Sequence, residues 1–282
     1  MPYLMSSSFD KFIENITIGG DTKKVATARR DAIIELLKEK FTILDSFPTG
    51  SLVRNTGLKN SSDADVIVVL HYGKHVENKT PRQLLESVQS ALGEYNAKII
   101  KKNGQAVTLY FKTWPNVDIV PAKRVTVGAF QNLRIPDANT GRWIATAPKA
   151  HDNRIANMPL RSRRLVRMVK CWNKAHSGYF LSYHIEKVVL EINAAHDGES
   201  WAEDDWPWAL AQYFKKAVEM TEPSTAMSAE YGIEDCTQLR ERLKRARDIS
   251  NEAWQTIYQD KNVEKAVGRL RVLFGDRFPA YG

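Results

Sequence analysis

The 282-residue sequence is 43% hydrophobic and 26% charged, which excludes disordered, collagenous and fibrous proteins. Lys and Arg total 41 against 33 acids, a net charge of +8, which suits a polyanionic ligand such as nucleotide phosphates, RNA or DNA without choosing among them. The two cysteines exclude a disulfide framework and a thiolate-rich zinc site, and favour a reducing cytosolic compartment.

The first half of the chain mixes helices and strands. Apolar residues at helical spacing predict helices over residues 8–16, 21–40 and 81–95. Apolar and β-branched runs predict strands over 41–47, 65–70, 97–101, 106–112 and 117–120. The run ending at Leu70 is almost continuously apolar, as in a strand buried on both faces. Asn103-Gly104 predicts the turn of a hairpin.

The second half of the chain reads differently. Residues 126–150 are rich in Gly, Pro, Asn and Asp and are expected to form a loop. Helical patterns then follow over residues 160–176, 182–195, 207–219, 237–258 and 263–274. The sequence therefore predicts an α+β protein with a boundary near residue 158: a domain over 1–158 that includes the opening helices, and an all-helical domain over 159–282.

Three acidic residues fall in or beside predicted strands. Asp63 and Asp65 are two residues apart, so in a strand their carboxylates point to one side. Asp118 lies between Val117 and Ile119, where burial makes a partner necessary. Three converging carboxylates could hold two divalent ions about 3.5 to 4 Å apart, as in phosphoryl displacement. The alternative is that the three acids are ordinary surface residues. Their occurrence together with the Gly-Ser motif favours the functional interpretation.

Gly50-Ser51 follows the first predicted strand. A glycine lets backbone amides approach a phosphate closely, and a serine hydroxyl can donate to it. The motifs Phe47-Pro48-Thr49-Gly50-Ser51, Asp63-Ala64-Asp65-Val66 and Val117-Asp118-Ile119 resemble the polymerase-β-type nucleotidyltransferase core. That resemblance implies a mixed sheet flanked by helices, packed on a C-terminal helical bundle with a central cleft between two lobes.

Two motifs of the helical half narrow the resemblance. Lys170-Cys171-Trp172-Asn173 and Phe180-Leu181-Ser182-Tyr183-His184-Ile185-Glu186 resemble the bacterial CD-NTases, relatives of cyclic GMP-AMP synthase and the oligoadenylate synthetases. The resemblance implies that Lys170 and Ser182 bind the donor triphosphate and that Tyr183 stacks on a base. Asn157 lies where related enzymes vary a base-reading side chain, with a helix-end cap as the alternative.

Other polar residues of the helical half are given structural interpretations. Arg163, Arg167 and Lys174 share a helix face with Lys170 and are expected to form a solvated stripe. The dispersed histidines are expected to cap or pack. Trp201, Trp206 and Trp208 are expected to pack between helices.

The leading hypothesis is a template-independent nucleotidyltransferase that makes a cyclic di- or trinucleotide from nucleoside triphosphates. The resemblance implies two Mg²⁺ ions, for which Mn²⁺ can substitute, held by Asp63, Asp65 and Asp118. It also implies anti-phage signalling through a nucleotide-activated effector. A linear oligonucleotide synthetase, a transferase acting on a small molecule or RNA end, and an inactive nucleic-acid-binding module remain the alternatives.

The expected setting of this enzyme is the cytoplasm. No apolar run approaches the roughly 18 residues that cross a bilayer, and the first eight residues lack the pattern of a signal peptide. We expect a monomer that needs no membrane. The spacing of His and Cys residues shows no zinc-binding insertion of the kind found in the animal cyclic GMP-AMP synthases, so we also expect that no nucleic-acid activator is needed.

Overall fold

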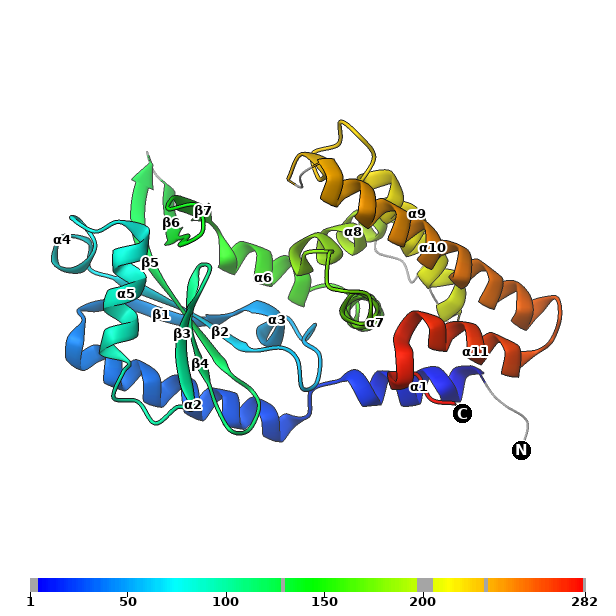
Figure 1. Ribbon diagram of the computed structural model, residues 1–282, viewed down its shortest axis with the longest axis horizontal. Helices are drawn as coiled ribbons and strands as arrows, with labels where there is room; N and C mark the ends of the chain where they lie inside the picture. Colours follow the sequence, from blue (N-terminus) through cyan, green and yellow to red (C-terminus); the bar gives the residue numbers. More distant parts are fainter. Residues whose placement is uncertain (1–4, 128–129, 197–204, 231–232, 281–282) are drawn as a thin grey trace. The chain divides into compact units, whose positions relative to one another are not determined.

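A computed structural model describes residues 5–127, 130–196, 205–230 and 233–280. These residues form two compact units (Figure 1). The sheet unit comprises residues 18–156, and the helical unit comprises the described residues of 1–17 and 157–282. The change of unit at residue 156 lies close to the predicted boundary. The opening segment, however, was expected in the first domain and instead belongs to the helical unit.

The described residues of the sheet unit form seven strands. They are β1 (Ile43–Thr49), β2 (Ala64–Leu70), β3 (Ile99–Asn103), β4 (Ala106–Tyr110), β5 (Val117–Val127), β6 (Phe130–Pro136) and β7 (Trp143–Thr146). The main order is β1-β2-β5-β4-β3, and β6 joins β5 to β7. All neighbouring strands are antiparallel except β2 and β5, which are parallel. The predicted hairpin at Asn103-Gly104 is confirmed by the pairing of β3 with β4.

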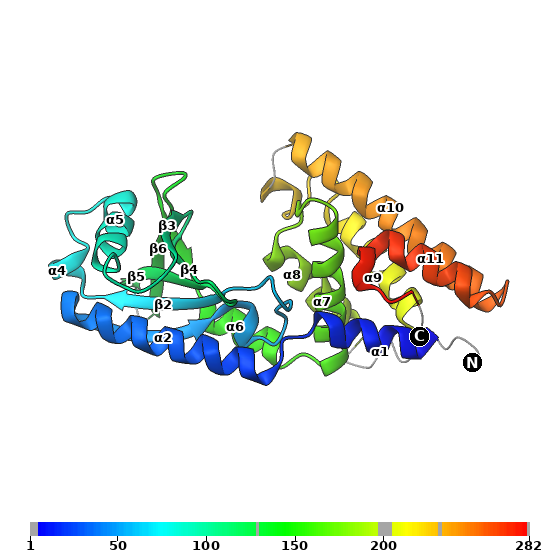
Figure 2. The same cartoon turned by 60° about the horizontal axis from the view of Figure 1, so that its bottom comes forward.

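The alternation of side chains divides this sheet into two faces. Val66 and Val68 of β2 and Ile119 of β5 pack in one core with the helices α2 (Gly20–Lys40) and α5 (Pro81–Ala91); Figure 2 shows α2 lying along β2. Ile67, Val69, Val120 and Ala122 belong to a second core on the other face. Burial on both faces explains why β2 reads as a continuous apolar run.

The loop predicted over residues 126–150 is wrong in its main feature. This stretch contains the end of β5, the strands β6 and β7, and the start of α6 (Pro148–Ala156). Three of the turn-forming residues that suggested a loop, Asp137, Asn139 and Gly141, lie between β6 and β7. There Asp137 accepts hydrogen bonds from the Asn139 backbone N–H and the Thr140 hydroxyl. A turn rich in Asp, Asn and Gly is what connects a hairpin, and β7, with only four residues, is too short to show a clear strand pattern.

The helical unit contains six longer helices. They are α1 (Met5–Ile16), α7 (Leu160–Ala175), α8 (Ser182–Ala195), α9 (Trp206–Met220), α10 (Ile233–Tyr258) and α11 (Val263–Phe274). All six were predicted, with ends that differ by up to four residues. Phe12 of α1 lies 4.5 Å from Phe274 and 5.2 Å from Phe278, measured between ring centroids. This buried aromatic cluster is why α1 belongs to the helical unit.

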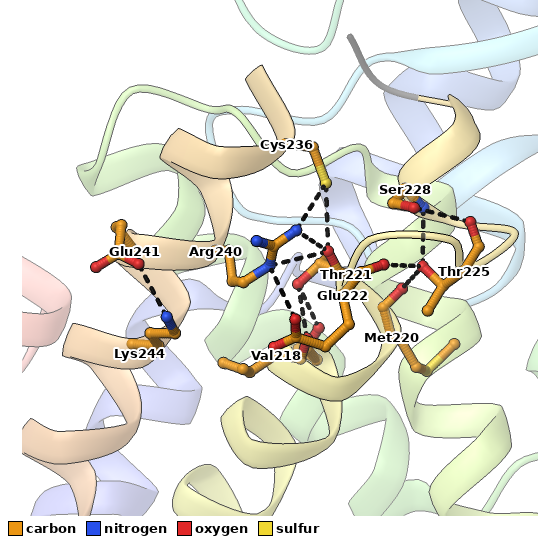
Figure 3. Close-up of polar contacts among 11 residues, drawn as sticks. Val218, Met220, Thr221, Glu222, Thr225, Ser228, Cys236, Arg240, Glu241 and Lys244 are labelled. Carbon is orange, nitrogen blue, oxygen red and sulfur yellow. Dashed lines mark hydrogen bonds and ion pairs between the residues drawn. The ribbon is translucent and has the colours of Figure 1, made fainter. Parts of the chain in front are cut away.

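The turn after α9 is held by a basic side chain from α10. Arg240 donates from Nε and Nη2 to the Thr221 carbonyl at 3.0 and 2.5 Å, and the Cys236 thiol donates to the same oxygen at 3.4 Å (Figure 3). A cation at the carboxyl end of a helix satisfies carbonyls that lack helical partners. Cys236 is buried and contributes to holding this turn.

None of the helices in the described ranges combines the length and the hydropathy needed to cross a membrane.

Candidate active site

Strand pairing brings two of the three predicted carboxylates together. In the parallel register of β2 and β5, Asp65 stands directly opposite Asp118, although 53 residues separate them along the chain. Their side chains share the face of Ile67 and Val120, opposite the helix-covered core. Asp63 comes just before β2 and lies two residues from Asp65, so an extended backbone would direct both side chains to the same face. The sheet therefore directs all three acids to one side.

The environment of Asp118 combines burial, one hydrogen bond and the charge of Asp63. Burial raises the pKa of the Asp118 carboxyl, and the negative charge of Asp63 raises it further. A hydrogen bond from the Thr108 hydroxyl to Asp118 Oδ1, 2.5 Å long, acts in the opposite direction. In the described part of the chain no ion pair joins Asp118 to an arginine. The carboxylate thus keeps one fixed hydrogen bond and is close to the other acids.

Asp63 is positioned by Asn116, which comes one residue before β5. The Asn116 side-chain amide donates to Asp63 Oδ1 at 3.1 Å, and its carbonyl oxygen accepts from the Phe111 backbone N–H at 3.2 Å. The Asn116 backbone carbonyl also accepts from the Ala64 N–H at 3.0 Å. One residue therefore fixes the start of β2 and the first carboxylate together.

The predicted Gly50-Ser51 turn lies directly after β1. Gly50 is buried, has φ +81° and starts the single-turn helix α3 (Gly50–Val53). Thr49, at the end of β1, pairs with Asp65 across the sheet, so this turn begins beside the second carboxylate. Ser51 is half-buried, and its carbonyl accepts from the Thr56 N–H at 2.9 Å. The turn thus follows the strand that pairs with β2, and it begins beside Asp65. The predicted phosphate-binding role needs such a position.

The donor set of the three aspartates fits a hard divalent cation, because carboxylate oxygens are the ligands that Mg²⁺ prefers. Within the described residues, no three or more His, Cys, Asp or Glu side chains lie together as a group that could hold a metal ion. The metal role of Asp63, Asp65 and Asp118 therefore stays a prediction.

The remaining predicted residues lie in the helical unit. The Lys170 ammonium contacts Glu186 Oε1 at 2.8 Å, and the two side chains are only 6% and 0% exposed. Ser182 is exposed at the start of α8, Tyr183 is 48% exposed, and Asn157 is exposed just after α6. Lys170 thus has a buried acidic partner in its own unit, whereas the other three are open to ligands.

The basic stripe on α7 is not the solvated surface that we expected. Lys174 is exposed and Arg163 half-buried, but Arg167 is only 6% exposed. Burial, with the charges of Arg164 and Arg163, lowers the pKa of Arg167 to about 10. The spacing of three and four residues correctly predicted that these cations share one face of the helix. It could not predict that other parts of the fold bury Arg167.

One histidine and one tryptophan illustrate the packing roles that we expected. His184 is fully buried, and Trp206 is 7% exposed and lies 6.3 Å from Phe9 between ring centroids. Both are packing residues. Trp201 lies outside the described residues.

Sequence reasoning missed Thr108 and Asn116. Thr108 is a hydroxyl residue inside the apolar strand β4 and is completely buried, which indicates a partner because buried polar groups are hydrogen-bonded. Asn116 stands two residues before Asp118. The sequence pattern does not show which residue each side chain contacts, because the partners Asp118 and Asp63 belong to other segments of the chain.

A protein-family model matches residues 4–158: the Second Messenger Oligonucleotide or Dinucleotide Synthetase domain. The match covers more than half of the 282 residues. The chain belongs to this family. The suspected CD-NTase relationship is thereby confirmed, and with it the nucleotidyltransferase class of the enzyme.

Individual relatives of this synthetase agree with the family. A probable cyclic nucleotide synthase of Bacillus cereus (strain VD146) is 24% identical over 233 residues, which cover 66% of this chain and 70% of the relative. The cyclic AMP-AMP-AMP synthase of an Acinetobacter species is 27% identical over 143 residues, covering 46% of this chain and 39% of that one.

The fold of this synthetase is also that of solved CD-NTases. The structure of the Bradyrhizobium diazoefficiens CD-NTase CdnG in complex with GTP has a TM-score of 0.76, with 14% identity over 96% of this chain and 95% of that chain. This likeness confirms the predicted α+β fold class with its mixed sheet.

Proposed function

We propose that this synthetase joins nucleoside triphosphates without a template into a cyclic di- or trinucleotide and releases pyrophosphate. The observation that carries the proposal is the register of β2 and β5, which sets Asp65 opposite Asp118 while the charge of Asp63 acts on Asp118. Three carboxylates next to a Gly-Ser turn are the set that nucleotidyl transfer requires. The family and the relatives named above support the same chemistry.

In each step a ribose hydroxyl oxygen attacks the α-phosphorus of a triphosphate. A new P–O bond forms, the bond to pyrophosphate breaks, and pyrophosphate leaves with the bonding electrons. Asp118 accepts the hydroxyl proton, the role that the resemblance to CD-NTases implies for it. A second transfer within the linear intermediate closes the ring.

The three aspartates would hold the catalytic cations, with Asp63 and Asp65 shared between two ions and Asp118 completing one site. When bound, Mg²⁺ or Mn²⁺ neutralises phosphate charge and stabilises the transition state. Gly50 and Ser51 would hold the donor phosphates. The resemblance to CD-NTases implies donor-phosphate binding for Lys170 and Ser182 as well. Tyr183 would stack on a base, and Asn157 would read a base edge.

The test is a reaction with purified protein, four NTPs and Mg²⁺ or Mn²⁺, followed by phosphatase and mass spectrometry. A cyclic product resists phosphatase, whereas a linear oligonucleotide loses its terminal phosphates. The variant Asp63→Ala, Asp65→Ala is expected to lose at least about 10³-fold in rate. Asp21→Asn, on the exposed surface of α2, is the matched control and should keep wild-type activity. Product formation by the double variant would refute the proposal.

The resemblance to CD-NTases supports a signalling role for the product. We propose that it activates a separate effector protein during phage infection. Wild-type protein expressed with its neighbouring genes should reduce phage plaques, whereas Asp63→Ala, Asp65→Ala should not. Salt-dependent nucleic-acid binding that survives loss of the aspartates, without any product, would instead favour the binding-module alternative.

A further inference from the structure

A single carboxylate holds both ends of the helix that carries the Gly-Ser turn. The Thr49 hydroxyl donates to Asp152 Oδ2 and the Arg54 guanidinium donates to Asp152 Oδ1, each at 2.6 Å. Thr49 is the residue before α3 and Arg54 the residue after it. Asp152 itself belongs to α6, which the chain reaches only after about a hundred further residues. We call these three residues the Asp152 clamp.

The clamp is shielded from solvent. The side chains of Arg54 and Asp152 are 12% and 8% exposed, and Thr49 is buried. A solvated ion pair contributes little, since water and ions screen it. In contrast, a buried pair is costly to break, because removing one partner leaves an uncompensated charge. The clamp therefore restrains α3 far more firmly than a surface contact would.

The segment that the clamp holds needs such a restraint. The helix α3 has only four residues, no side-chain hydrogen bond from Thr49 to its first turn, and a left-handed glycine at its start. An isolated turn of helix is unstable, because nucleation orders several residues for one hydrogen bond. Its position must therefore come from tertiary contacts.

We propose that Asp152 is a positioning residue for nucleotidyl transfer, which fixes the Gly50-Ser51 turn beside Asp65 through Thr49 and Arg54. The inference rests on the proposed function, because it assumes that this turn holds the donor triphosphate. Arg54 has a second effect: its charge neutralises Asp152, which would otherwise repel a polyphosphate bound nearby. Asp152 touches neither substrate nor metal in this role and acts only through its two partners.

Two variants separate positioning from mere stability. Asp152→Asn removes the negative charge that faces Arg54, and it also removes one of the two acceptor oxygens. Thr49→Val removes one hydrogen bond and keeps the ion pair between Arg54 and Asp152. Glu86→Gln is the matched control for a lost ion pair, because the Glu86–Lys102 pair is half-exposed and belongs to the same unit. Val88→Ala is the control for stability alone, since Val88 is a buried core residue of α5.

The first measurement is amide hydrogen exchange over residues 50–56, where the Arg54 and Thr56 N–H groups bond to Gly50 and Ser51. Exchange in this segment is expected to be at least about tenfold faster in both clamp variants, and unchanged in Glu86→Gln and Val88→Ala. Wild-type exchange in both clamp variants would overturn the clamp. This readout needs no activity, so it distinguishes failure of the clamp from failure of the proposed function.

The second measurement compares kinetics and metal binding. The clamp variants should raise KM for NTP by about tenfold or more, while Mn²⁺ binding to the nucleotide-free protein stays within twofold of wild type. Variants with the same melting temperature are then compared. The positioning role would be overturned if the clamp variants lost no more kcat/KM than Val88→Ala does. If Asp152→Asn fails to fold, Thr49→Val decides the same question, because it leaves no buried charge unpaired.

Discussion

Gly50 lies so close to Asp65 that no side chain fits between them. A Cβ atom on Gly50 would stand 1.8 Å from Asp65 Oδ2, well inside any allowed contact. The glycine is therefore required twice, once for its left-handed backbone with φ +81° and once for the space that the carboxylate occupies. The Gly50-Ser51 turn and the second aspartate therefore form one structural unit.

Gly50→Ala should displace the Asp65 carboxylate. We expect a loss of at least about 10²-fold in product formation, as for a misplaced catalytic group, together with a loss of stability, because the added Cβ would strain the left-handed backbone and clash with Asp65. Gly141→Ala is the matched control, because Gly141 has a similar φ of +68° but nothing within 4 Å of its Cβ position. Equal activity losses in the two variants would mean that backbone strain alone is responsible.

Thr108→Val should shift the pH dependence of the reaction. The Thr108 hydrogen bond favours the ionised form of Asp118 and so lowers its pKa, against the larger effect of burial. The proposed base role requires Asp118 to be ionised, so activity is expected to fall as the pH drops through its pKa. Loss of the hydrogen bond raises that pKa and moves the acidic limb of the kcat/KM profile to higher pH. Thr108→Ser should restore the wild-type profile, and an unmoved limb in Thr108→Val would contradict the assignment.

Asn116→Ala should weaken cation binding at the aspartates. The side-chain amide of Asn116 orients Asp63, and removal of a group that orients a metal ligand typically costs 10–100-fold in metal affinity. Titration with Mn²⁺, followed by electron paramagnetic resonance, measures this without nucleotide. Asn132→Ala, at an exposed position of β6, should bind Mn²⁺ as wild type does. If Asn116→Ala does the same, Asp63 is not a ligand that Asn116 orients.

The Lys170–Glu186 pair allows structural and phosphate-binding roles to be separated. Glu186→Gln leaves the buried ammonium without its acidic partner and should destabilise the protein by about 3–5 kcal/mol. The double variant Lys170→Met, Glu186→Met removes both charges and should recover most of that loss in thermal unfolding. If Lys170 also holds the donor triphosphate, the double variant will be stable yet bind NTP weakly. Wild-type NTP affinity in the double variant would restrict Lys170 to a structural role.

Much of this fold could be predicted because local patterns determine it. The helices α8 and α11 begin and end at the predicted residues, since apolar spacing and capping act within a few residues. The strand β2 was found because both of its faces are buried. The hairpin of β6 and β7 was missed, since β7 has only four residues and the turn residues between the two strands dominate the local pattern.

By itself, the sequence determined the chemistry available to this synthetase: acids two residues apart on one side of an apolar strand, a third acid inside another strand, and a Gly-Ser turn. Only the tertiary structure decided how these groups are held. The pairing of Asp65 with Asp118, the bonds from Thr108 and Asn116, the Asp152 clamp and the burial of Lys170 all join different elements of the fold. Such contacts depend on sheet register and on which helix covers which side chain, and neither is set by residues adjacent in the chain.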